Sequence, residues 1–260
     1  MLRTLLLDVS LVVATLCAVG SATIIGRPRL TELQAEVRPR LRESAPYLGV
    51  LVIVLAANSA IRDYGKQLSR LIGVDITYLL ADLDFGIVAA VQSVQTELLT
   101  EYFSVIYVYG YVFVLVFPVL AYAALSDRKP FQRLLVAYSL NYLIGLVLYI
   151  IFIAYGPRNY IPGLYENLLY DTNAQYQFLT SEVNNPTNVF PSLHTSLSAT
   201  VAIFAYRTRQ EYPEWVVVAT ALAVSIILST MYLGIHWATD VVFGIGLAGL
   251  SVYLADNYID

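Results

Sequence analysis

Residues 134–155 read LLVAYSLNYLIGLVLYIIFIAY, a run of 22 residues without a charged side chain. Crossing a hydrocarbon core about 30 Å thick takes roughly 20 apolar residues in a helix. The run is therefore long enough to span a bilayer. Asn141 is its strongest polar interruption and can bond to a neighbouring helix.

The rest of the chain has the same character. Of its 260 residues 58% are hydrophobic and 13% are charged, whereas soluble domains average roughly 25% charged. The net charge of −4 and the lack of a basic run argue against a nucleic-acid partner. Cys17 is the single cysteine, so no disulfide framework or cysteine-rich metal site is expected. The composition indicates an integral membrane protein.

Hydropathy predicts an all-α fold, a polytopic transmembrane helical bundle that forms one domain over residues 1–260. The two shortest candidates are the second and the fifth. The seven expected spans are Leu5–Ile25, Tyr47–Ala60, Phe103–Leu125, Phe131–Tyr155, Ser192–Tyr206, Trp215–Met231 and His236–Leu254.

Positive charge alternates between the connecting loops. The first, third and fifth loops hold ten of the 15 Lys and Arg residues, whereas the fourth, from Gly156 to Pro191, has only Arg158. The positive-inside bias therefore predicts odd loops in the cytoplasm, with the N-terminus outside. A cleaved signal peptide at Leu5–Ile25 is disfavoured, because it would leave the five-arginine first loop outside.

The second loop, residues 63–102, is long and partly apolar. Ile76–Leu80 and Phe85–Val91 are candidates for interfacial or re-entrant helices. An amphipathic segment on the outer leaflet is the favoured interpretation. A lid over a functional site is the alternative.

The only two histidines, His194 and His236, lie 42 residues apart at the starts of the fifth and seventh spans. That separation allows one helix, a turn and a helix back, so both rings are expected at the outer face. Asp240 follows His236 by four residues, and we expect the two to share a helix face. A carboxylate there fixes the imidazole tautomer and leaves the other ring nitrogen as nucleophile or base. Pro191 suits a helix start, and Ser192 with free N–H groups offers an anion site.

These residues resemble motifs of the type 2 phosphatidic acid phosphatase superfamily. Pro191-Ser-Leu-His194 is similar to its Pro-Ser-Gly-His motif, and the segment from Ser229 to Asp240 matches Ser-Arg-x5-His-x3-Asp in spacing. The resemblance covers about residues 150–250, and the first half only in general layout.

The chain departs from the family pattern at several positions. Thr230 replaces the arginine of the third motif, and Leu193 replaces glycine. The first motif, Lys-x6-Arg-Pro, is met only by Arg158. The departures look most like the inositol phosphorylceramide synthase branch, whose members transfer phosphorylated headgroups between lipids. Lys66 or Arg70 could supply the missing positive charge.

The resemblance implies a lipid phosphatase or phosphotransferase with a phosphohistidine intermediate. His236 would attack phosphorus, oriented by Asp240, while His194 would act as acid and then as base. Arg158 and Ser192 would bind the phosphate. The implied enzyme uses no metal or other cofactor, and its partners are a lipid phosphate and the bilayer, with the site on the extracytoplasmic side of the cell membrane.

Two alternatives of other classes remain open. His194 and His236 could be the axial ligands of a haem in an electron carrier, in which case Asp240 has no required role. The protein could also be a lipid transporter or scaffold without catalytic activity. A Soret band would identify the first, and the lack of phosphate release or headgroup exchange the second.

Overall fold

The computed structural model describes residues 2–172, Tyr176 and residues 187–259. Nearly all of the described regular structure is helical, as expected for an all-α bundle. The strands β1 and β2, two residues each, pair in parallel at Val74–Asp75 and Phe152–Ile153. The helices are α1 (Leu2–Gly20), η1 (Ser21–Ile25), α2 (Arg27–Ile72), α3 (Thr77–Leu83), α4 (Ile87–Gln92), α5 (Glu97–Val105), η2 (Ile106–Gly110), α6 (Tyr111–Ala123), α7 (Lys129–Ile151), α8 (Pro157–Tyr160), α9 (Leu168–Thr172), α11 (Leu193–Arg207), α12 (Pro213–Tyr232) and α13 (Ala238–Tyr258).

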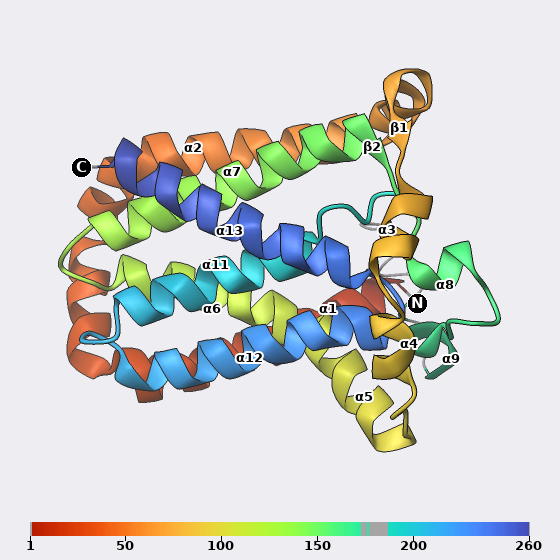
Figure 1. Cartoon of the computed structure of the whole chain (residues 1–260). Coiled ribbons are helices and arrows are strands. Elements are labelled where there is room, and N and C mark those ends of the chain that lie inside the picture. The colour runs from red at the N-terminus through yellow and green to blue at the C-terminus, as the bar shows by residue number, and fades with distance from the viewer. Residues whose placement is uncertain (1, 173–175, 177–186, 260) are drawn as a thin grey trace.

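Long helices run back and forth between two ends of the bundle, and the chain termini lie at opposite ends (Figure 1). Six described helical segments are long and apolar enough to cross a membrane, which makes this a multi-pass membrane protein. They are Leu2–Ile25, Arg27–Ile61, Glu97–Ala123, Lys129–Ile151, Pro213–Tyr232 and Ala238–Tyr258.

The helix α11 occupies the middle of the bundle and contacts α6, α7, α12 and α13. At 15 residues and about 1.5 Å per residue it is roughly 22 Å long, shorter than a hydrocarbon core. It lies where the fifth of seven spans was expected. The count of seven spans therefore stays a prediction.

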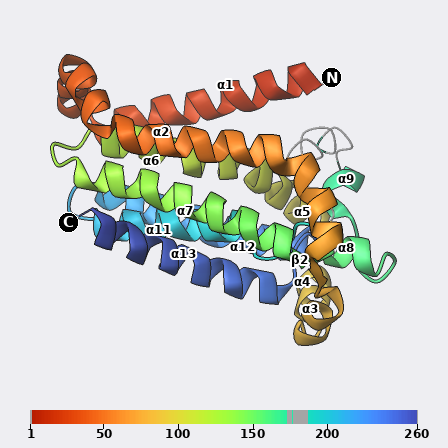
Figure 2. The same cartoon turned by 90° about the horizontal axis from the view of Figure 1, so that it is seen from above.

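The first connecting loop was predicted wrongly. Residues 27–46, expected as a loop before the span at Tyr47–Ala60, belong to the continuous 46-residue helix α2. Figure 2 shows its first part folded across one end of the bundle before the helix turns to run along α7. Pro39 and Pro46 lie inside α2, and proline commonly kinks a helix because it removes a backbone donor.

Arg40 ties this first part of α2 to the bundle. Its side chain is 3% exposed and donates hydrogen bonds of 2.9 Å to the carbonyls of Ala123 and Leu125, at the end of α6. Glu32 and Glu36 pair with the same guanidinium. A buried arginine is stable only when its donors are paired in this way.

The second connecting region folds across the opposite end of the bundle (Figures 1 and 2). The expected helices at Ile76–Leu80 and Phe85–Val91 correspond to α3 and α4. Leu80 and Val88 are buried against Trp237 and Val241, at the start of α13. Tyr78, Leu79 and Phe85 are exposed on the other side. The segment therefore presents one apolar face to the bundle and a second one outward.

Candidate functional site

The first histidine, His194, is the second residue of α11. Ser192 caps this helix: its side chain accepts a hydrogen bond of 3.3 Å from the Thr195 backbone N–H. Such caps satisfy one of the free donors at a helix start. The Ser192 hydroxyl is fully buried, so its predicted phosphate contact would have to coexist with this cap.

Two tyrosines flank the His194 ring. The ring of Tyr107 is stacked on it with centroids 4.4 Å apart, and that of Tyr111 is tilted against it at 4.0 Å. Tyr107 belongs to the π-helical turn η2, and Tyr111 is the first residue of α6. Single π-turns inside longer helices are frequent at functional sites. Aromatic packing therefore sets the orientation of this imidazole.

The second histidine, His236, lies in the turn between α12 and α13. Its backbone N–H donates to the Thr230 carbonyl at 3.1 Å. The expectation that His236 opens a helix and shares a helix face with Asp240 is wrong, because α13 begins two residues later, at Ala238. The turn still brings His236 Nδ1 within 3.4 Å of Asp240 Oδ2. The pair exists because of the turn and not because of helical spacing.

Asp240 is fully buried, and its Oδ2 also accepts a hydrogen bond of 2.8 Å from the Trp237 N–H. Its Oδ1 and the Nδ1 of His236 have no hydrogen-bond partner among the described residues. Catalytic hydrogen bonds are often long before substrate binds. The arrangement can fix the tautomer of His236 and hold a positive charge on its ring.

The starts of α11 and α13 are joined directly. The backbone N–H of Ser192 donates to the carbonyl of Asp240 at 3.1 Å. His194 lies two residues after Ser192, and His236 lies four residues before Asp240. The structure therefore brings the two predicted histidines and the predicted carboxylate to one end of the bundle.

Arg158, from the short helix α8, lies beside this turn. Its backbone N–H donates to the Gly234 carbonyl at 3.1 Å. Gly234 has a φ of +68°, and a Cβ there would approach Arg158 Cβ to 3.3 Å. Glycine is thus needed both for the left-handed backbone and for the close approach. The predicted phosphate-binding arginine is placed next to the predicted nucleophile.

The Arg158 guanidinium contacts neutral groups, donating to Asn167 Oδ1 at 3.0 Å and to the Tyr170 hydroxyl at 3.1 Å. Within the described part of the chain no acidic side chain pairs with it. Burial lowers the pKa of His236, a hydrogen bond with the Val189 backbone opposes this, and the positive charge of Arg158 lowers it further. Both burial and Arg158 therefore favour the neutral, nucleophilic form of this ring.

The structure accounts for one departure from the phosphatase motifs. Gly145 of α7 lies against Leu193, and a Cβ at residue 145 would come within 2.8 Å of the Leu193 side chain. The larger residue is accommodated by a small one on the facing helix. Thr230 is fully buried, and its hydroxyl donates to the Ile227 carbonyl at 2.7 Å, so it does not replace a cation.

The sequence suggested Lys66 and Arg70 as substitutes for the missing cations. Arg70 is exposed in the last turn of α2, and the Lys66 side chain lies outside the described part. No group of three or more His, Cys, Asp or Glu side chains that could hold a metal ion occurs among the described residues.

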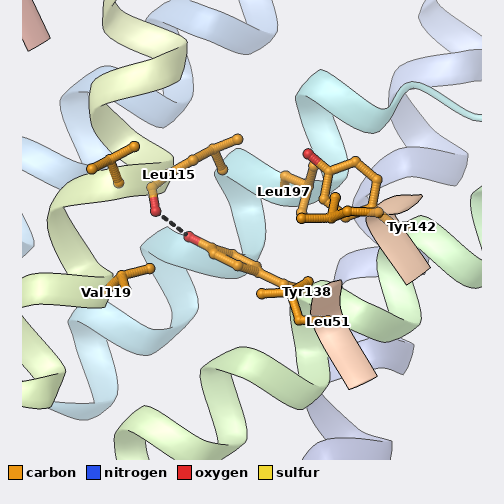
Figure 3. Close-up of a pocket in the computed structure, with 8 residues that line it drawn as sticks. Leu51, Leu115, Val119, Tyr138, Tyr142 and Leu197 are labelled. Carbon is orange, nitrogen blue, oxygen red and sulfur yellow. Dashed lines mark hydrogen bonds between the residues drawn. The ribbon is translucent and has the colours of Figure 1, made fainter. Parts of the chain in front are cut away.

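An apolar groove of about 260 Å³ is lined by residues of α2, α6, α7 and α11 (Figure 3). Leu115 follows Tyr111 by four residues, and Leu197 follows His194 by three, so the groove begins about one helical turn from the His194 ring. Its other walls come from α2 and α7. The lining residues are Leu51, Leu55, Leu115, Val116, Val119, Tyr138, Tyr142 and Leu197.

Several residues of this end were not found from the sequence. Tyr107 and Tyr111 are four residues apart, a spacing that puts them on one helix face, but tyrosines are common near span ends. Asp84 and Gln92 lie in the second loop, where no pattern marks them. Gln92 donates to the carbonyls of Tyr232 and Glu166 at 3.0 and 3.1 Å. It thereby links α4 to the end of α12 and to the segment between α8 and α9.

Fold and site together define a multi-pass helical membrane protein with two histidines and a carboxylate gathered at one end. Comparison with known families agrees: residues 75–254 match the model of the PAP2 superfamily. The match covers more than half of the chain, so the protein belongs to the PAP2 superfamily.

Among curated proteins, an uncharacterized protein of Methanocaldococcus jannaschii is 27% identical over 159 residues. The aligned region is 60% of this chain and 61% of that protein. No solved structure matches the chain significantly.

Proposed function

We propose that the protein is a membrane enzyme that cleaves or transfers the phosphate of a phosphorylated lipid through a phosphohistidine intermediate. The observation that carries this proposal is the direct junction of two helix starts, Ser192 N–H to Asp240 carbonyl at 3.1 Å, which gathers His194, His236 and Asp240. Membership of the PAP2 superfamily supports phosphate chemistry at this place.

His236 is the proposed nucleophile, through the ring nitrogen that does not face Asp240; this nitrogen gives up its interaction with the Val189 backbone, and its proton moves to the nitrogen that faces Asp240, before it attacks. A nitrogen–phosphorus bond forms while the bond from phosphorus to the leaving oxygen breaks, and His194 gives that oxygen a proton. Water or a lipid alcohol then attacks the phosphohistidine and returns a proton to His194. The products are inorganic phosphate or a new phosphate ester, and free His236 is restored.

Arg158 and the backbone N–H groups of the α11 first turn are the proposed ligands of the phosphoryl oxygens. A guanidinium without an acidic partner among the described residues retains its charge for an anion. The Ser192 hydroxyl already accepts from Thr195 but keeps its own proton to donate. These donors would stabilise the charge that develops on the phosphoryl group.

A lipid is the proposed substrate because an apolar groove between helices of the membrane bundle begins about one helical turn from the His194 ring. One hydrocarbon chain in the groove of Figure 3 would leave its phosphate about one turn away, at His194. The arginines at the start of α2, the start of α7 and the end of α11 lie at the end of the bundle away from the site (Figure 1). Since positive charge favours the cytoplasmic side, this supports a site on the extracytoplasmic side of the cell membrane.

The test is incubation of purified protein in detergent with a panel of phosphorylated lipids, reading free phosphate and new lipid products by mass spectrometry. His236→Ala should abolish turnover while the protein stays folded by size exclusion. Free phosphate alone indicates hydrolysis, and new phosphorylated lipids indicate transfer. Near-normal turnover by His236→Ala would refute the assignment of the nucleophile.

A further inference from the structure

The segment between α2 and α5 is attached, through both its first and its last residues, to the end of the bundle where the site lies. On one side β1 pairs with β2 through Val74 and Phe152. On the other, the Gln92 amide bonds to the Tyr232 carbonyl at the end of α12. The segment is therefore attached both to the end of α7 and to the residue at the end of α12, just before the turn that carries His236.

Asp84 lies in the middle of this segment, between α3 and α4, and is fully buried. Its carboxyl group accepts two backbone hydrogen bonds, from the N–H of Val88 at 3.1 Å and from the N–H of Ala238 at 3.0 Å. The first bond is local, whereas the second crosses 154 positions of sequence to the first residue of α13.

Burying a carboxyl group to make such a contact carries a desolvation cost in free energy. Serine, threonine or asparagine satisfies a helix start as well, without the cost of removing a potential charge from water. The N-terminal end of a helix favours a negative group, which offsets part of that cost. The position of Asp84 therefore calls for a role beyond closing a turn.

That role follows from what lies next to Ala238. The two N–H groups that follow His236 are both held by carboxyl oxygens: Trp237 by Asp240 at 2.8 Å and Ala238 by Asp84 at 3.0 Å. The N–H of His236 itself is held by the Thr230 carbonyl. Three consecutive backbone donors around the proposed nucleophile are thus fixed, and only one of the three anchors comes from outside the region of α12 and α13.

We propose that Asp84 is a positioning residue for His236 and that the α3–α4 segment acts through it as part of the active centre. This inference rests on the proposed function. Displacements of about 1 Å at a reacting group can reduce turnover a hundredfold. Loss of the Asp84 anchor should therefore lower kcat, while KM should change little because no substrate contact is removed.

The experiment compares wild type, Asp84→Ala, Asp84→Leu, Asp84→Asn and the matched control Asp82→Asn with the same lipid phosphate. Asp82 is two residues away, carries the same group and is exposed. We expect the Ala and Leu variants to lose at least about tenfold in kcat per folded molecule, with KM within about twofold of wild type. The Asn variant keeps one acceptor oxygen for the two N–H groups; because that oxygen can still accept from Ala238 once the Val88 bond is given up, its kcat should lie between those of wild type and the Ala variant. The Asp82 variant should match wild type.

Asp84→Leu keeps the forked shape of the side chain, with a larger volume, and leaves no cavity, so it tests the inference even where Asp84→Ala does not fold. A folded Ala or Leu variant with wild-type kcat would overturn the inference, as would an equal loss in Asp82→Asn. If the wild-type protein itself turns over no lipid phosphate while remaining folded, the proposed function fails, and that result is distinct from an active wild type with unaffected variants.

Discussion

Replacing Asp240 by asparagine tests the proposed histidine–carboxylate pair most directly. The change removes the negative charge but keeps an oxygen that can accept from the Trp237 N–H, so the start of α13 should survive. Only the interaction with His236 is altered. The variant should therefore separate chemistry from folding.

The distance gives the expected magnitude. A positive charge on the His236 ring and the Asp240 carboxylate, 3.4 Å apart, attract each other by about 5 kcal/mol at an effective dielectric constant of about 20. A neutral amide keeps about 1 kcal/mol of this as a hydrogen bond, which leaves a loss of about 3–4 kcal/mol. Since about 1.4 kcal/mol corresponds to a factor of ten, kcat should fall roughly 10²–10³-fold.

The assay is turnover of the best lipid phosphate of the panel, per molecule of folded protein. Asp256→Asn is the matched control, because this residue lies on the same helix but pairs with Arg207 at the other end of the bundle. We expect it to match wild type. Turnover by Asp240→Asn within about threefold of wild type, in protein of normal thermal stability, would refute the reasoning.

Three further predictions use the same preparation. Tyr111→Ala removes a ring packed on His194, worth about 0.5–1.5 kcal/mol for an aromatic pair, so kcat should fall about two- to tenfold while Tyr111→Phe stays near wild type; equal values for the two variants would contradict this. Leu115→Trp should fill the apolar groove and lower kcat/KM about tenfold for a long-chain lipid phosphate but not for a short-chain, water-soluble analogue. A similar loss on both substrates would argue against a chain in the groove. Arg40→Ala leaves the Ala123 carbonyl without this hydrogen bond, whereas the Leu125 carbonyl keeps its bond from Arg128, so the protein should be destabilised by about 2 kcal/mol, seen as a lower Tm; Arg38→Ala at an exposed position should not lower it.

Most of the helical architecture was predictable from the sequence, because hydrophobic length is a local property. The expected span Phe131–Tyr155 corresponds to α7 (Lys129–Ile151), and Trp215–Met231 to α12 (Pro213–Tyr232). The first part of α2 was missed because its arginines and two prolines are typical of a loop. In the folded bundle it is helical, and Arg40 attaches it to the end of α6, a contact that no local sequence pattern encodes.

The candidate site was only partly predictable. His194, His236, Asp240 and Arg158 were identified by motif spacing, and that spacing is local to one helical hairpin and its flanks. The helical explanation for the pairing of His236 with Asp240 was wrong, although the pair itself is present. The turn before α13, fixed by Gly234 and the Thr230 carbonyl, brings the His236 ring close to the Asp240 carboxyl group instead.

The sequence by itself determined that the fold is a bundle of apolar helices, the rough limits of most of them, and the two histidines that are candidates for chemistry, because these depend on residue type and short spacing. Only the tertiary structure decided which distant groups surround them. The tyrosines on His194, Asp84 on Ala238 and Gln92 on Tyr232 are contacts between segments more than 80 residues apart, and no local pattern encodes them. They arise because the helices pack in one arrangement, and that arrangement brings the second loop over the end of the bundle where the histidines lie.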